Sequence, residues 1–182
     1  MSQLRTNSIV PLDGLPAGAS GGGIVQVVHK VDASTSTSTS TSWTNTGVSG
    51  LNLSITPTSS SNKILMIVHM QLECGSGTNA GSIIFARNPA GTPTYFGNSG
   101  VSFSVDPAND SNGLSKTFLS QGYGGLNGQI TSHSGVDSPG TTSSVTYGVL
   151  WGTNSGTIYY NRGAAGQVYN SSSTIILMEI SG

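Results

Sequence analysis

The side chains that most often carry out chemistry are few in this chain and lie far apart. The 182 residues include three histidines and one cysteine. His29, His69 and His133 have no Asp, Glu or Cys at the spacing of a metal-binding motif. His69 lies in an apolar run, so we interpret it as a core or subunit-interface residue; three copies of it on the axis of a trimer are an alternative. The sequence therefore predicts no metal and no other cofactor.

The acidic residues do not form a recognisable reaction centre. The segment from Asp106 to Gly113 resembles a calcium loop, but Ala108 occupies a ligand position and no closing glutamate follows, so a capped turn is expected. Glu73 and Glu179 are the only glutamates, and we expect them at strand ends rather than across a sugar cleft. No Gly-x-Ser-x-Gly motif occurs. We therefore expect a protein that is not an enzyme.

Three aromatic residues and the cysteine have structural interpretations. Trp151 ends an alternating apolar pattern and is expected in the core. Tyr159 and Tyr160 are adjacent in a predicted strand and must point to opposite faces, so one of them is expected at an exposed or subunit-interface position. Cys74 has no second cysteine to pair with and is expected to be a buried, unreactive thiol.

Composition limits the class of protein. Charged residues make up 7% of the chain and the net charge is -1, whereas soluble domains are about 25% charged. The six basic residues are scattered singly, which argues against a nucleic-acid partner and against a membrane partner. The start of the chain lacks the apolar core of a signal peptide, so synthesis in a cytoplasm is expected. Near-zero net charge suits a subunit whose surface is covered in an assembly.

The apolar residues are grouped into short runs that predict strands. The strongest run, residues 63–73, is interpreted as a central strand buried on both faces. Further strands are predicted at residues 24–31, 51–56, 82–87, 101–105, 116–119, 145–151, 157–161 and 173–180. The turn at 154–156 predicts a hairpin between its neighbours, and no firm pairing is predicted for the Gly- and Ser-rich residues 120–142. Residues 24–182 are therefore predicted to form an all-β, antiparallel β-sandwich or jelly roll.

Residues 1–23 have a different character and are predicted to form an extended anchoring arm. Their apolar residues show no period: Ile9, Val10, Leu12 and Leu15. Two prolines favour extended backbone, and three consecutive glycines at 21–23 supply a hinge. Such a segment cannot bury its own apolar side chains. We expect it to dock on another protein, with a disordered arm as the alternative.

The chain resembles a family through several segments that follow one another in order. They are Trp43–Gly47, Leu51–Leu65, Asp137–Thr142, Val145–Tyr147, Thr157–Arg162 and Ser173–Ile180. These segments look like those of small tail-fibre-type and structural proteins of tailed bacteriophages, especially marine phages and cyanophages. The resemblance covers roughly residues 24–182, and Leu4–Pro11 is similar to the short segments that attach such proteins to the particle. It implies a jelly roll of the C1q and tumour-necrosis-factor type, commonly a homotrimer.

Three functions follow as expectations. The first is a virion structural protein: a tail or collar fibre-type appendage anchored by its arm and in contact with the host surface. The second is capsid decoration. The third is a glycan-binding module using loops 88–100 and 106–143, whose composition suits adaptable recognition. The expected partners are two further copies of the chain, another virion protein and a host-surface glycan. The expected location is the virion, assembled in the bacterial cytoplasm.

Overall fold

The described part of the chain is built from β-strands. The computed structural model describes residues 23–74, 80–96, 116–119, 129–153, 156–162 and 171–182. Within these residues there is one short 3-10 turn, η1 (Ser49–Leu51), and no α-helix, so no helix there is long and apolar enough to cross a membrane. The predicted arm, the predicted strand 101–105 and the calcium-like loop lie outside the described residues.

A six-stranded antiparallel sheet is organised around β4 (Lys63–Cys74). One edge of β4 pairs with β11 (Ser173–Ile180) and then with β10 (Ile158–Tyr160), while the other edge pairs with β8 (Gln129–Asp137). Two further strands extend this sheet: β1 (Ile24–Asp32) beside β11, and β2 (Ser36–Ser38) beside β10. The strand order β1-β11-β4-β8 thus forms its broadest part.

A five-stranded antiparallel sheet forms the second layer. Its central pair is β9 (Val145–Thr153) and β5 (Ala80–Arg87). The short strand β3 (Leu53–Ile55) lies outside β9, and β6 (Thr94–Tyr95) and β7 (Lys116–Leu119) share the far edge of β5.

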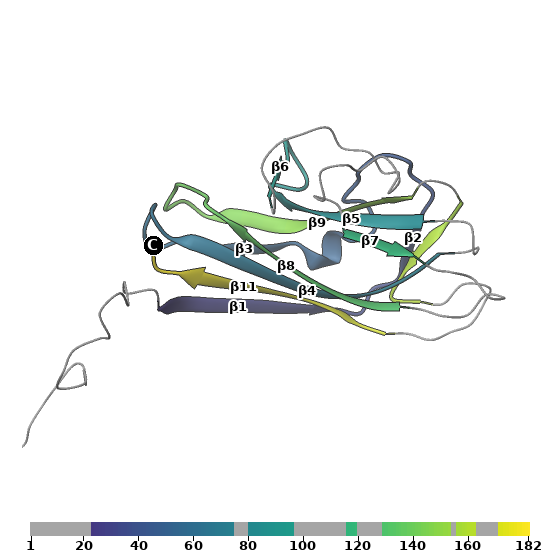
Figure 1. Ribbon diagram of the computed structural model, residues 1–182, viewed down its shortest axis with the longest axis horizontal. Helices are drawn as coiled ribbons and strands as arrows, with labels where there is room; N and C mark the ends of the chain where they lie inside the picture. The colour runs from purple at the N-terminus through teal and green to yellow at the C-terminus, as the bar shows by residue number, and fades with distance from the viewer. Residues whose placement is uncertain (1–22, 75–79, 97–115, 120–128, 154–155, 163–170) are drawn as a thin grey trace, which may run out of the picture.

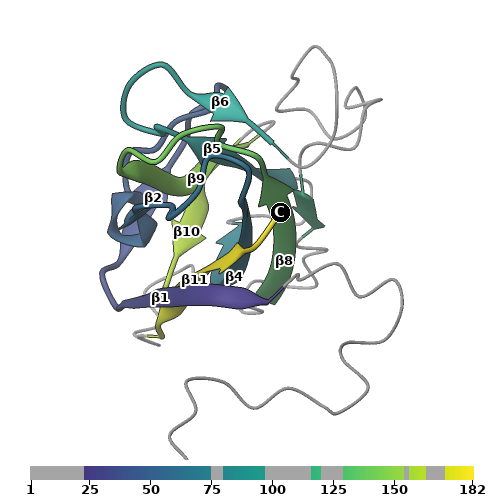
Figure 2. The same ribbon diagram turned by 90° about the vertical axis from the view of Figure 1, so that its left-hand side faces the viewer.

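The two sheets pack face to face, which confirms the predicted β-sandwich. In Figure 1 β1, β11 and β4 form the lower layer, and β9, β5 and β6 form the upper one. Figure 2 shows the same layers from the end, with β1 and β6 on opposite sides. The orders β1-β11-β4-β8 and β3-β9-β5-β7 are compatible with a jelly roll.

The core lies between the sheets and follows the two-residue period of the strands. Large apolar side chains from β4, β9, β10 and β11 enter it: Ile64, Met66, Val68, Met70, Leu72, Tyr147, Val149, Trp151, Ile158, Tyr160, Ile175 and Leu177. Trp151 and Tyr160 meet edge to face, with ring centroids 6.1 Å apart. Burial of these side chains, at about 25 cal/mol per Å² of apolar surface, is the main favourable term for the fold.

The interpretation of residues 63–73 was correct about position and wrong about burial. Strand β4 is central, because both of its edges are paired. Over residues 63–71, however, only its inward face is buried: Leu65 and Ile67 are half-buried, and Lys63 and His69 are exposed. Glu73, near the end of the strand, is buried. The described part of the chain supplies one covering layer for β4, whereas its sequence is apolar on two faces.

Two predictions about pairing also need correction. The turn at 154–156 does not join a hairpin, because β9 belongs to the five-stranded sheet and β10 pairs with β4 and β2 in the other. Strand β8 was not predicted at all, although it pairs with β4 over nine positions. Its inward positions include Gly135, where an added Cβ would lie 3.0 Å from the Phe85 ring, so a small residue is required where an apolar signal would normally appear.

Candidate functional site

The outer face of the six-stranded sheet carries a continuous set of apolar side chains. Pairing places Val27, Met178, Leu65 and Val136 directly opposite one another on β1, β11, β4 and β8. The next row along the strands is His29, Ile176, Ile67 and Ser134, and the following row is Val31, Thr174, His69 and Ser132. Residues directly opposite in a sheet share a face, so these twelve side chains form one surface, which we call the outer face.

Apolar side chains on the outer face are open to solvent. The exposed fraction is 51% for Val27, 57% for Val31 and 47% for Val136, and Ile130 further along β8 is 81% exposed. Four strands spaced ~4.8 Å apart, over the length of these rows, cover on the order of 300–400 Å². Seven of the twelve side chains in the rows are apolar. An apolar patch of a few hundred Å² on a single chain is often a functional surface.

The twelve side chains of the outer face carry no formal charge, and the exposed Lys63 lies one row beyond them on β4. The three rows contain no Asp, Glu, Lys or Arg, and their titratable groups are His29 and His69. A neutral surface of this kind can approach a second copy of itself without like-charge repulsion.

The residues singled out from the sequence lie in different environments. Trp151 and Tyr160 are fully buried in the core, whereas Tyr159 is half-buried, with the Arg162 guanidinium 5.3 Å from its ring centroid. His69 is exposed on the outer face and is not a core residue. The arm residues Ile9, Val10, Leu12 and Leu15 lie outside the described residues.

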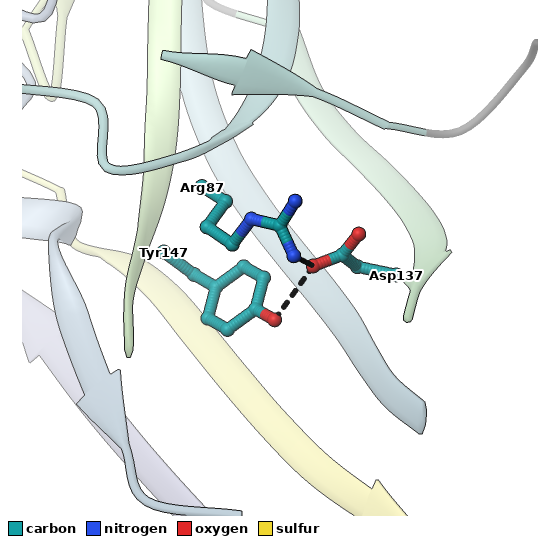
Figure 3. A network of polar contacts seen from close by, with 3 residues as sticks. All are labelled: Arg87, Asp137 and Tyr147. Carbon is teal, nitrogen blue, oxygen red and sulfur yellow. Dashed lines mark hydrogen bonds and ion pairs between the residues drawn. The ribbon is translucent and has the colours of Figure 1, made fainter. Parts of the chain in front are cut away.

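A polar network between the sheets is the most chemically distinctive group in the core (Figure 3). Tyr147 on β9 donates to Asp137 Oδ2 on β8 at 2.7 Å, and Arg87 Nη1 on β5 lies 3.3 Å from the same oxygen. Burial raises the pKa of the Tyr147 phenol, and the hydrogen bond to the carboxylate raises it further. A phenol with a raised pKa stays protonated, so Tyr147 acts as a hydrogen-bond donor that links β9 to β8.

A second buried carboxylate organises the end of the sandwich. Glu179 Oε1 accepts hydrogen bonds from the backbone and side chain of Thr58 and from Asn62 Nδ2, at 2.6–2.8 Å, and Oε2 accepts one from Gln26 Nε2 at 2.6 Å. Burial opposes ionisation, but the bonds from Asn62, Gln26 and Thr58 outweigh it and lower the pKa of Glu179 from 4.5 to about 2. This carboxylate ties β11 to β1 and to the loop before β4.

Both glutamates lie one residue before the ends of their strands, as expected, but their side chains are buried. Neither carboxylate oxygen of Glu73 has a hydrogen-bond partner in the described part of the chain. Glu179, by contrast, accepts hydrogen bonds from β1 and from the loop before β4. The two carboxylates thus occur in separate environments with no shared cleft described between them.

Metal-binding groups do not gather in the described regions, where no three His, Cys, Asp or Glu side chains come close enough to hold an ion. His29 and His69 belong to the outer face in different rows. His133 is on the inward side of β8, where it contacts the Thr131 hydroxyl. The described histidines therefore have no common centre.

Sequence reasoning missed half of the outer face. It predicted the strand at 24–31 that carries Val27, His29 and Val31, but it assigned Leu65 and Ile67 to a strand buried on both faces. It did not assign the outward residues of β8. The available signal was the even spacing of Ile130, Ser132, Ser134 and Val136, which a polar, glycine-containing stretch concealed. Comparisons of this chain with protein-family models and with curated proteins find no match.

Proposed function

We propose that this protein is a non-enzymatic structural subunit that assembles with copies of itself through the outer face. In this proposal it is a homotrimeric tail or collar fibre-type component of a bacteriophage particle. The assembly role is supported by the apolar, uncharged rows across β1, β11, β4 and β8. The assignment to a phage particle is supported by the resemblance of residues 24–182 to such proteins.

The strongest single support is the mismatch between the sequence of β4 and its surroundings. Leu65 and Ile67 face outwards on a central strand, although central strands with two apolar faces are normally covered on both. In a trimer, three outer faces that converge on the three-fold axis would together bury on the order of 1,000 Å², which is the size at which specific interfaces begin. The two neighbouring copies in the trimer would therefore supply the missing layer.

A structural rather than catalytic role also agrees with the use of the charged groups. Asp137 and Glu179 have hydrogen-bond partners that join strands or loops of the fold. Asp32 accepts a hydrogen bond from the Tyr160 hydroxyl at 2.8 Å, which ties β1 to β10. The hydrogen bonds of these three carboxylates therefore connect elements of the fold. In this proposal the arm, through Ile9, Val10, Leu12 and Leu15, docks on a neighbouring virion protein.

The test is the oligomeric state of the purified protein. Native mass spectrometry and light scattering at micromolar concentration are expected to give the mass of three 18.5-kDa chains. The double variant Val27→Glu/Val136→Glu places two charges in one row of the outer face and is expected to give folded monomers. The matched control Ser143→Glu/Ser144→Glu adds the same charge at exposed positions before β9 and should remain trimeric. A wild-type monomer, or a double variant that still assembles, would contradict the proposal.

A further inference from the structure

A groove lies on the opposite side of the molecule, over the outer surface of the five-stranded sheet. It has a volume of about 610 Å³ and is lined by Trp43, Thr44, Asn45, Thr46, Gly47, Ser49, Pro89, Ala90, Gly91, Pro93, Tyr95 and Leu150. Leu150 is in a small buried cluster on the outward side of β5 and β9, against which Trp43 and Tyr95 pack. We propose that this groove binds a neutral oligosaccharide. This function goes beyond the proposed assembly role.

The first support is the chemistry of the lining. One part is apolar and flat, with the Trp43 and Tyr95 rings and two prolines, and another part is polar, with the hydroxyls of Thr44, Thr46 and Ser49. A pyranose presents C–H groups on its faces and hydroxyls around its edge, so it matches both kinds of surface. Sites for small molecules typically have this combination of mostly apolar walls and a few polar groups, with volumes of about 300–1,000 Å³.

The second support is the absence of charge. None of the residues that line the groove is Asp, Glu, Lys, Arg or His. A phosphorylated or carboxylated ligand would lose its hydration there without gaining an ion pair, which is costly. Among saccharides, the groove therefore selects neutral ones over sialylated or phosphorylated ones.

The third support is that one wall of the groove is held in place before any ligand arrives. Thr44 and Trp151 exchange backbone hydrogen bonds at 3.1 and 2.9 Å, and Trp151 Nε1 donates to the Thr46 carbonyl at 2.7 Å. Asn45 and Asn52 exchange side-chain bonds at 3.1 and 2.8 Å, and Asn45 Nδ2 also donates to the Val149 carbonyl. A preformed wall lowers the ordering cost of binding.

Trp43 also retains an unused donor. Its indole Nε1 is buried and has no hydrogen-bond partner in the described regions of the chain. A buried donor without an acceptor costs about 1–3 kcal/mol. This atom is buried away from the groove surface, so Trp43 contributes to the lining through its ring and not through this donor. A proline-rich peptide is the competing kind of occupant for an aromatic groove, but it has fewer hydroxyl and amide groups to satisfy the polar rim.

The experiment uses the full chain and a glycan array, followed by NMR titration with the neutral trisaccharides that bind on the array. The chain has two tryptophans, so two indole N–H signals report on the site. We expect at least one neutral saccharide to bind with a millimolar or lower Kd and to shift the Trp43 signal. The comparator is sialyllactose, which should not bind. The oligomeric state is measured on the same samples, so loss of binding and loss of assembly are separate results.

The test variant is Gly91→Leu. Gly91 lines the groove, and an added Cβ would meet no atom within 4 Å, so leucine narrows the groove without a clash. It is expected to weaken saccharide binding about tenfold or more, a change of ~1.4 kcal/mol. The matched control, Gly23→Leu, also meets no atom within 4 Å and should leave affinity unchanged.

Three results would overturn the inference. The first is an array with no neutral glycan bound. The second is binding that Gly91→Leu does not weaken. The third is a synthetic peptide of residues 7–18, which contains Pro11 and Pro16, occupying the groove and shifting the Trp43 signal where no sugar does. The last result would identify the groove as a receptor for the arm.

Discussion

Tyr147 on β9 donates a 2.7 Å hydrogen bond to Asp137 on β8, and this bond joins the two sheets of the sandwich. Arg87, directly opposite Tyr147 on β5, approaches the same carboxylate oxygen at 3.3 Å. Phe96 packs edge to face on the Tyr147 ring, with centroids 5.6 Å apart. The hydrogen-bond donor and the ion-pair partner of the Asp137 carboxylate thus both come from the opposite sheet, and an aromatic ring packs against the donor.

Removal of the phenolic hydroxyl is the mildest way to test this link. Tyr147→Phe keeps the ring and its packing but leaves Asp137 with Arg87 alone, so we expect a loss of about 2 kcal/mol in the free energy of unfolding. Asp137→Ala should cost more, because both donors then lose their buried acceptor. Urea denaturation measures both values. Equal stability of Tyr147→Phe and wild type would show that the bond contributes nothing net.

The Glu179 carboxylate predicts a specific acid sensitivity. Its pKa is about 2 in the folded protein and 4.5 without the fold, so the folded state favours the ionised form. The stability it contributes is fully present above pH 4.5 and is lost as the pH falls from there through about 2. We expect the free energy of unfolding to decrease across this window, measured by urea denaturation at successive pH values.

Glu179→Gln supplies the matched comparison for that titration. Glutamine has the same shape but cannot ionise, and its amide NH₂ would face the donors of Thr58 and Asn62. We expect a loss of about 2–3 kcal/mol at pH 7 and a flatter dependence between pH 4.5 and 2. If the variant kept the wild-type slope, other carboxylates would be responsible for the acid sensitivity.

The fold was predictable from the sequence because its strands follow simple patterns. Alternation of apolar and polar residues at 145–151 and 173–180 indicates strands with one buried face, and these ranges correspond to β9 and β11. The pattern does not say which sheet a strand joins. Tyr159 and its neighbours were therefore assigned to a hairpin with β9, although the crossover between sheets places them beside β4. Such a choice depends on packing of the whole sandwich and not on the local turn.

The two candidate sites were less accessible to sequence reasoning, for different reasons. Apolar residues at 63–73 indicate burial on both sides, but the sequence does not distinguish a covering layer in the same chain from one in another copy. The groove depends on Trp43 and Tyr95, which are 52 positions apart in the sequence and line the same groove because both pack on Leu150 and its neighbours. No periodic pattern in the sequence predicts that two such distant residues line one groove.

Gly47 predicts a local backbone effect next to the groove. Its φ is +85°, in the left-handed region, and a hydrogen bond from Val48 N to the Asn45 carbonyl closes the turn around it. An added Cβ would lie 2.6 Å from Ser36 Oγ and 3.1 Å from the Trp151 ring. We expect Gly47→Ala to cost about 1–3 kcal/mol in thermal or urea unfolding.

Gly91→Ala is the natural control for that substitution. Gly91 also lies in a turn, but an added Cβ there meets nothing within 4 Å and no positive φ restricts the position. Its stability should stay within about 0.5 kcal/mol of wild type. Comparable losses for both variants would mean that the strained conformation and the close contacts at Gly47 are not what limits substitution.

Neighbouring residues of β4 separate folding from assembly. Met66 is fully buried between the sheets, whereas Leu65 points to the outer face and is half-buried. Met66→Ala leaves a core cavity and is expected to lower the free energy of unfolding by about 2–5 kcal/mol. Leu65→Ala removes apolar area from the proposed contact between copies, so its main effect should be on association.

The measurement that distinguishes the two variants is the dependence of Tm on protein concentration. A folded oligomer gains stability with concentration by mass action, so the wild type and Met66→Ala should both show a rising Tm, offset from each other. Leu65→Ala should show a weaker rise and more monomer by light scattering at the same concentration. A Tm independent of concentration in the wild type would mean that the outer face of β4 is not covered by a second copy, and Leu65 would then be a solvent-facing residue of a monomer.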